Sequence, residues 1–191
     1  MQAIHTTLPS TIVETPRLLL KELTPELITK LYTTFSNEDI MQFLGLQTIA
    51  ELETERNKFT QGLTMYRISF KHFLMLEKNS GNIIGRIGFH WWHVPHSRAE
   101  IGYAMFGNEH KQKGYMTEAI MAVVAFGFNN MNLNRIEAFI GSHNIASQRL
   151  VERQGFTKEG LLRAHYCNNG IIEDSLCYSL LRSEFKANKQ Q

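Results

Sequence analysis

Cysteine is scarce in this chain, which contains only Cys167 and Cys177 among its 191 residues. Two cysteines are too few for the disulfide framework of a small secreted domain. Neither of them lies in a Cys-x-x-Cys or Cys/His spacing that is typical of a metal site. We therefore expect two reduced thiols and no structural metal.

A strong excess of charge is also missing, because 20 Lys and Arg residues face 18 Asp and Glu residues, for a formal net charge of +2. This balance argues against a nucleic-acid-binding protein, which normally carries a concentrated basic patch. The longest apolar run, residues 119–128, is interrupted by Gly127 and is far shorter than the ~20 residues that cross a bilayer. Residues 1–16 lack the basic start and continuous apolar stretch of a signal peptide. We expect a cytoplasmic protein that binds neither nucleic acid nor membrane.

The chain does contain enough apolar residues, 43%, for the core of a single domain spanning residues 1–191. Alternating or β-rich runs predict strands at 17–23, 72–77, 83–91, 99–106, 135–140, 156–162 and 171–181. Helical patterns and capping residues predict helices at 25–35, 50–62, 117–131 and 144–154. Hairpin strands followed by strand–helix–strand–helix–strand predict a mixed α/β domain. The helix at 117–131 is apolar nearly all round, which predicts burial against the sheet.

A glycine flanked by lysines precedes that buried helix, in the segment 109–119, EHKQKGYMTEA. Helix N-termini present unpaired backbone N–H groups and a partial positive charge, and glycine lets a phosphate approach the backbone. The segment therefore suits a phosphate-bearing ligand. A surface turn with solvated lysines is the alternative.

Several segments, taken in order, carry a family resemblance: TPRLLLKEL, NIIGRIGFH, AEIGYAMFGNEHKQKGYMTEA, NRIEAFIGSHNIASQRLVERQGFTKEGLLR and DSLCYSLLRSE. Together they resemble the GCN5-related N-acetyltransferase (GNAT) superfamily, and within it the ribosomal-protein-alanine N-acetyltransferase type, over about residues 13–185. The resemblance implies an α/β (α+β) GNAT fold. In that fold a mixed, mostly antiparallel sheet of about seven strands is flanked by about four helices and splayed to hold acetyl-CoA. It also implies direct acetyl transfer to a primary amine in a ternary complex, without an acyl-enzyme.

The family's cofactor loop follows the pattern Gln/Arg-x-x-Gly-x-Gly/Ala. It falls here on Lys111, Gln112, Lys113, Gly114, Tyr115 and Met116. Only Gly114 matches strictly, and Met116 would have to turn away from the ligand. The resemblance implies that backbone groups of residues 112–117, ending at Thr117, bind the pyrophosphate. It further implies that the backbone of Ala104, Met105 and Phe106 holds the carbonyl and the pantetheine arm.

Glu100 matches a family glutamate that takes the proton of the amine, often through water. Strand alternation places it on one face with Gly102 and Ala104, where small neighbours would leave room for substrate. The alternative is a structural glutamate that pairs with Arg98 or is held in a buried hydrogen bond.

Candidates for the proton donor to the leaving thiolate lie near the next helix. Many superfamily members use a tyrosine at the position that corresponds to Val151, which cannot donate a proton. The ribosomal-protein type instead has an Asn-x-x-Ser arrangement, matched by Asn144, which would bind the pantetheine arm, and by Ser147, which would lie near the thiolate. The alternative roles are a helix N-cap for Asn144 and an ordinary first-turn position for Ser147. Tyr166 is a second candidate acid or substrate contact, or a packing residue.

His90, His93 and His96 alternate with Trp91 and Trp92. On a regular strand His90 and His93 would point to opposite faces, and no carboxylate or cysteine completes a ligand set. We therefore expect no metal here, and tryptophans that pack or line the acceptor groove.

The acceptor amine is only partly constrained by the sequence. An α-amino group has a pKa of ~7.7–8.0, against ~10.4 for lysine, so a weak base suffices for a protein or peptide N-terminus. This acceptor is preferred over a small molecule such as an aminoglycoside, polyamine or amino-acid analogue. A non-catalytic acyl-CoA-binding protein is a further alternative, and a homodimer is one of the oligomeric states left open.

Overall fold

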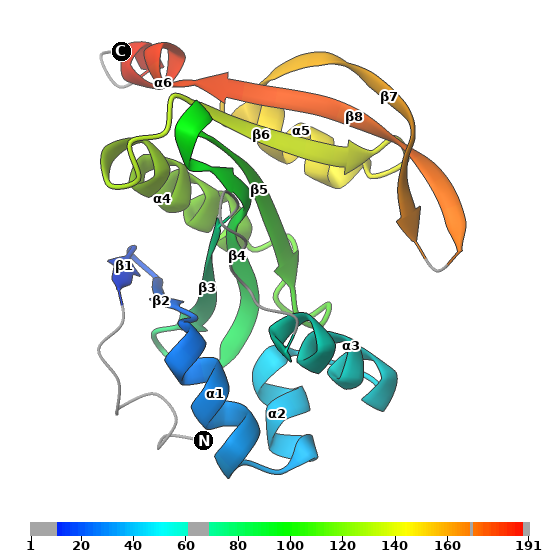
Figure 1. Ribbon diagram of the computed structural model, residues 1–191. Helices are drawn as coiled ribbons and strands as arrows, with labels where there is room; N and C mark the ends of the chain where they lie inside the picture. Colours follow the sequence, from blue (N-terminus) through cyan, green and yellow to red (C-terminus); the bar gives the residue numbers. More distant parts are fainter. Residues whose placement is uncertain (1–10, 61–68, 169, 189–191) are drawn as a thin grey trace.

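The computed structural model describes residues 11–60, 69–168 and 170–188 (Figure 1). Its strands are β1 (Ile12–Glu14), β2 (Leu18–Glu22), β3 (Ser69–Glu77), β4 (Ile83–His93), β5 (Arg98–Met105), β6 (Arg135–Gly141), β7 (Thr157–Asn168) and β8 (Ile171–Leu181). Its helices are α1 (Pro25–Thr34), α2 (Asn37–Leu44), α3 (Ile49–Thr60), α4 (Tyr115–Asn129), α5 (Ile145–Arg153) and α6 (Arg182–Asn188), with a 3₁₀ turn at Val94–His96. Within these described ranges no helix combines the length and the apolarity needed to span a membrane.

The strands form one sheet in the order β1-β2-β3-β4-β5-β6-β8-β7. Neighbouring strands are antiparallel except β5 and β6, which run parallel and pair only along Arg98–Glu100 and Arg135–Glu137. Beyond these residues the two strands diverge (Figure 1). The expected mixed, mostly antiparallel and splayed sheet is therefore confirmed, and Glu100 lies at the point where the splay begins.

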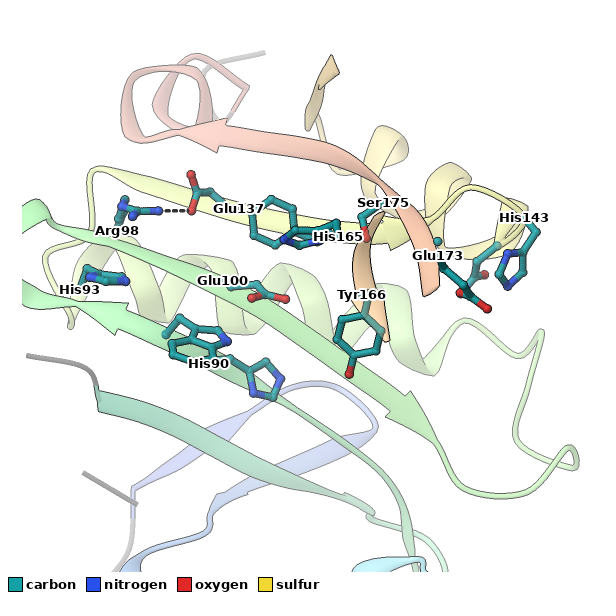
Figure 2. Close-up of a pocket in the computed structure, with 14 residues that line it drawn as sticks. His90, His93, Arg98, Glu100, Glu137, His143, His165, Tyr166, Glu173 and Ser175 are labelled. Carbon is teal, nitrogen blue, oxygen red and sulfur yellow. Dashed lines mark hydrogen bonds and ion pairs between the residues drawn. The ribbon is translucent and has the colours of Figure 1, made fainter. Parts of the chain in front are cut away.

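Two core clusters cover opposite faces of the sheet, and strand alternation decides which residue joins which. On β3, Leu74 and Leu76 join the cluster formed with α1, α2 and α3, whereas Phe73 and Met75 join the cluster that contains α4. As the apolar sequence of α4 predicts, this helix is buried against the sheet. On the face opposite α4, polar side chains of β5, β6 and β8, among them Glu100, Glu137 and Ser175, line a pocket (Figure 2).

The structure contains three elements that the sequence patterns miss, namely β1, α2 and α6. β1 has three residues, too few to show alternation, and eight-residue α2 depends on its ends: Ser36 caps it by accepting the Asp39 N–H at 3.2 Å, and Gly45 closes it at φ 69°. α4 begins at Tyr115 rather than at Thr117. The predicted helix 50–62 corresponds to α3, and residues 61 and 62 lie outside the described residues.

Candidate active site

The loop before α4 has the geometry of an anion site. Gly114 is the N-cap residue of α4 at φ 80°, and no side chain caps the helix. The first backbone N–H groups of any α-helix lack an intrahelical acceptor, so those at Tyr115, Met116 and Thr117 remain available to a ligand. Arg17 fixes the loop, because its Nη1 donates to the Lys113 carbonyl at 3.0 Å. The residues present therefore fit a pyrophosphate.

The two side chains that follow Gly114 lie against the protein. The Tyr115 hydroxyl contacts the Glu77 carboxylate, and the Arg17 guanidinium stacks 4.5 Å from the Tyr115 ring centre. Met116 packs against the main core cluster. The departure from the family pattern at Met116 therefore leaves the backbone of the loop accessible. Lys111, the other departure, donates from Nζ to Asn108 Oδ1 at 2.8 Å.

Two cavities flank β5. The first, which we call the polar pocket, has a volume of about 700 Å³ and lies on the face opposite α4. It is lined by His90, Trp91, His93, Arg98, Glu100, Glu137, Phe139, Gly141, His143, Asn144, His165, Tyr166, Glu173 and Ser175 (Figure 2). The second, which we call the loop pocket, has about 760 Å³ and includes Ala104, Met105, Phe106 and Lys111 beside the α2–α3 connection. The structure thus groups Glu100 with Asn144, and the three backbone-binding candidates with Lys111.

Glu100 occupies the centre of the polar pocket, near His90, Glu137 and Tyr166 (Figure 2). Burial raises the pKa of Glu100 to about 7, and the negative charge of Glu137 adds to this rise. A carboxyl group that titrates near neutral pH is suited to accept a proton from an amine.

The pairing of Glu100 with Arg98 that the sequence left open is not found. Arg98 Nη1 instead donates to Glu137 at 2.7 Å, and Arg135 Nε reaches the same carboxylate at 2.8 Å. Arg135 also binds Glu159, with Nη1 donating at 2.8 Å. Both arginines therefore form ion pairs with carboxylates other than Glu100.

The imidazole ring of His90 occupies the space over Gly102. This corrects the expectation that small residues on this face of the strand leave that space open for substrate. A Cβ at residue 102 would lie 2.1 Å from His90 Nε2, so only glycine accommodates the ring. His90 pairs directly with Glu100 across β4 and β5, and its Nδ1 lies 3.0 Å from His72 Nε2. The small residue next to Glu100 thus allows an imidazole pair to pack beside the carboxylate.

A β-bulge on β4 overturns the expectation that His90 and His93 point to opposite faces. The register shifts between these residues, and Trp91 adopts φ 47°, a conformation that is rare for a bulky residue. The bulge adds a residue to β4, so that both histidines and Trp91 line the polar pocket. Trp91 is 57% exposed there, free of the core packing that fixes Trp92.

A second bulge shapes the opposite wall, on β7. Here the register shifts between Leu162 and Tyr166, and Ala164 adopts φ 51° while its N–H donates to Asp174 Oδ1 at 2.8 Å. The strand continues past the predicted end at residue 162, and His165 and Tyr166 line the polar pocket. Bulges commonly redirect side chains next to active sites. The two bulges supply aromatic side chains to the pocket that contains Glu100.

Asn144 and Ser147 have the capping arrangement, since Asn144 Oδ1 accepts the Ser147 N–H at 3.1 Å. The Asn144 amide group remains as the part of this side chain that can donate to a ligand. Val151 is fully buried in the core and cannot contribute a proton. Among the described residues, no three His, Cys, Asp or Glu side chains gather where they could hold a metal ion.

Sequence reasoning missed Tyr103, a residue of β5 on the face opposite Glu100. Its hydroxyl is buried and, among the residues that the structure describes, makes no hydrogen bond of ordinary geometry, although Ser147 lies close enough to oppose the rise in pKa that burial causes. Buried polar groups are almost always paired, so an orphaned hydroxyl marks a place where a ligand can supply the partner. Its position three residues after Glu100 in a strand was the only available signal.

Comparisons with known proteins place this geometry in context. The family model of the acetyltransferase (GNAT) domain matches residues 17–157. A relative from Bacillus subtilis (strain 168), named as an uncharacterized N-acetyltransferase, YoaA, is 34% identical over 172 residues, which cover 90% of this chain and 97% of that protein.

Two solved structures from Vibrio cholerae share the fold. One protein, provisionally named a ribosomal-protein-serine acetyltransferase, has a TM-score of 0.65 at 22% identity, covering 91% of this chain and 98% of that chain. Mutant forms of the spermidine/spermine N-acetyltransferase SpeG give a TM-score of 0.67 at 20% identity, covering 92% of this chain and 100% of that chain.

Proposed function

The chain belongs to the acetyltransferase (GNAT) family, and we propose that it moves the acetyl group of acetyl-CoA directly to the α-amine of a protein or peptide N-terminus. The observation that carries this proposal is a half-buried carboxyl, Glu100, with a pKa of about 7 at the centre of an open polar pocket.

Acetyl-CoA would supply a thioester carbonyl that is reactive toward a free amine. The backbone N–H groups at the start of α4 would hold its pyrophosphate, and Asn144 together with the backbone of residues 104–106 would hold its pantetheine arm. Glu100 would take the proton of the amine, directly or through one water, and Ser147 would give a proton to sulfur.

The lower pKa of an α-amine, compared with that of a lysine side chain, favours an N-terminus as the acceptor. Moving a proton from an amine of pKa ~8 to a group of pKa about 7 costs roughly 1.4 kcal/mol. The same transfer from a lysine of pKa ~10.4 costs about 4.6 kcal/mol. The difference corresponds to a factor of roughly 200 in the population of the reactive amine, which favours N-termini over lysine side chains.

A polyamine is the second candidate acceptor, because the polar pocket contains three carboxylates, Glu100, Glu137 and Glu173, together with exposed Trp91 and Tyr166. Carboxylates and aromatic faces both attract ammonium groups. A polyamine whose terminal amine has a lysine-like pKa would meet the same proton-transfer cost.

Acetyl-CoA turnover should be compared for peptides with a free N-terminus, the same peptides with a blocked N-terminus and an internal lysine, and spermidine. We expect kcat/KM to be largest for the free N-termini and release of thiol to be lost when the α-amine is blocked. Faster turnover of spermidine than of the free N-termini would instead favour a polyamine as the acceptor. Absence of thiol release with every amine, despite acetyl-CoA binding, would favour a non-catalytic acyl-CoA-binding protein.

A further inference from the structure

The unpaired hydroxyl of Tyr103 lies at the sheet splay, where β5 has separated from β6. β5 pairs with β6 only as far as Glu100, and Tyr103 lies further along the diverging strand (Figure 1). α5 follows β6 on the other side of the splay and carries Ser147 in its first turn. Burial raises the pKa of Tyr103, and the neighbouring Ser147 side chain opposes that rise. Ser147 therefore lies near the Tyr103 hydroxyl, although the two groups do not form a hydrogen bond of ordinary geometry in the described part of the chain.

We propose that Tyr103 is a positioning residue for Ser147, with the Tyr103 hydroxyl donating a hydrogen bond to Ser147 Oγ while Ser147 protonates the departing sulfur. This inference rests on the proposed use of acetyl-CoA, but it is independent of which amine is the acceptor.

The amine nitrogen bonds to the acetyl carbon, and the carbon–sulfur bond breaks with its electron pair passing to sulfur. Before attack the ammonium group has lost one proton through Glu100 to water; as the amide forms, its nitrogen loses a second proton to Glu100, and sulfur gains one from Ser147 Oγ. Water then takes the proton from Glu100 and returns one to Ser147.

A serine hydroxyl is a weak acid, so negative charge builds on Oγ as its proton moves. A donor that is already in place and shielded from water stabilises such a charge most effectively. Tyr103 meets both conditions, since its hydroxyl is buried and makes no competing hydrogen bond within the described part of the chain. Val151, at the position where the family resemblance implies a tyrosine, is buried and apolar, which leaves this role to another side chain.

The test is a double-mutant cycle with Tyr103→Phe, Ser147→Ala and their combination, measured with any primary amine that gives turnover. We expect Tyr103→Phe to lower kcat by about 10- to 100-fold, and KM for acetyl-CoA to change by less than about 3-fold. In the Ser147→Ala background the same change should alter kcat by less than about 2-fold, because Tyr103 acts through Ser147.

Tyr178→Phe is the matched control. Tyr178 is fully buried in the same core cluster, and its hydroxyl donates to Glu152 Oε1 at 3.0 Å rather than facing Ser147. Its removal should leave kcat unchanged. Equal losses from Tyr103→Phe in both Ser147 backgrounds, or an unchanged kcat in Tyr103→Phe, would overturn the proposal.

A second readout needs no acceptor. The pH dependence of CoA binding, measured by calorimetry, gives the pKa of the thiol of bound CoA. This pKa should rise in Tyr103→Phe and in Ser147→Ala, and the rise in the double variant should be no larger than in Ser147→Ala alone. If CoA does not bind to the unmodified protein, the proposed use of acetyl-CoA is wrong. If CoA binds but its thiol pKa is the same in Tyr103→Phe, only the positioning role of Tyr103 is wrong. If Tyr103→Phe melts well below Tyr178→Phe, Tyr103→fluorotyrosine keeps the ring and provides a more acidic donor. It should raise kcat only when Ser147 is present, and an unchanged kcat would reject the positioning role.

Discussion

Replacing Glu100 by glutamine tests the base assignment through two quantities that should change in opposite directions. The amide resembles the protonated carboxyl in shape but cannot take a proton from an amine. Loss of a general base typically costs ~10²–10⁴-fold in rate, and we expect kcat/KM of Glu100→Gln to fall in that range. The same variant should be more stable than the unmodified protein above neutral pH.

The magnitude follows from the pKa of Glu100, which is raised from 4.5 to about 7. Below about pH 4.5 the carboxyl is protonated in both folded and unfolded chains, so glutamine confers no advantage there. As the pH rises from about 4.5 to about 7, the unfolded chain ionises freely while the folded protein resists ionisation, and stability is lost. The full shift of about 2.5 units corresponds to ~3.4 kcal/mol, and screening by solvent at this partly open site reduces our expectation to ~1–2 kcal/mol.

Urea unfolding at about pH 5 and about pH 8.5 measures this difference directly. Glu53→Gln, on the exposed surface of α3, is the control for loss of a carboxylate without burial. We expect Glu100→Gln to gain stability relative to the unmodified protein mainly at the higher pH, while Glu53→Gln shows no such dependence. Equal effects of Glu100→Gln at both pH values, or a kcat/KM within about 3-fold of the unmodified protein, would refute the assignment.

The remaining predictions concern the charges, the loop and the pocket wall. The acid limb of kcat/KM should have an apparent pKa near 7 and should move to lower pH in Glu137→Gln, because the charge of Glu137 helps raise the pKa of Glu100; an unmoved limb would count against Glu100. Gly114→Ala should cost ~1–2 kcal/mol in thermal unfolding, from a φ of 80°, and weaken acetyl-CoA binding in a titration. Gly170→Ala, at φ 82° in open space, should lower stability by a similar amount but leave acetyl-CoA binding unchanged. Trp91→Ala should raise KM for the acceptor by roughly 2- to 30-fold, leaving KM for acetyl-CoA unchanged, whereas Trp92→Ala should mainly lower the melting temperature. Equal acceptor KM values in both tryptophan variants would remove Trp91 from the acceptor site.

The sheet, the buried helix and the glycine at the start of that helix were predictable because each depends on a local pattern. Alternation assigns Leu74 and Phe73 to opposite faces of β3, and the apolar residues of α4 require burial. Gly114 is recognisable because its position at a helix start needs a positive φ, which glycine adopts without strain.

The walls of the polar pocket were not predictable in the same way. Both bulges place non-glycine residues, Trp91 and Ala164, at positive φ, and nothing in the alternation of polar and apolar residues records the extra residue. Since a shift of one position moves every later side chain to the other face, His93 was assigned to the wrong side of β4. Tyr103 was missed for a different reason: its hydroxyl becomes significant only because α5, more than 40 residues later in the chain, brings Ser147 beside it.

The ion pairs near Glu100 involve the neighbouring carboxylates and leave Glu100 without an arginine partner among the described residues. Two arginines, Arg98 and Arg135, lie near the carboxylates of Glu100, Glu137 and Glu159 on the sheet. The bond with Arg135 lowers the pKa of Glu159 to about 2, and both arginines bind Glu137, so the two positive charges are already matched by two carboxylates. For the third carboxylate, Glu100, the cost of burial and, to a smaller extent, the repulsion of Glu137 raise the pKa to about 7. Burial of the one carboxylate of these three that neither arginine binds thus supports the proposed role of Glu100 as the base.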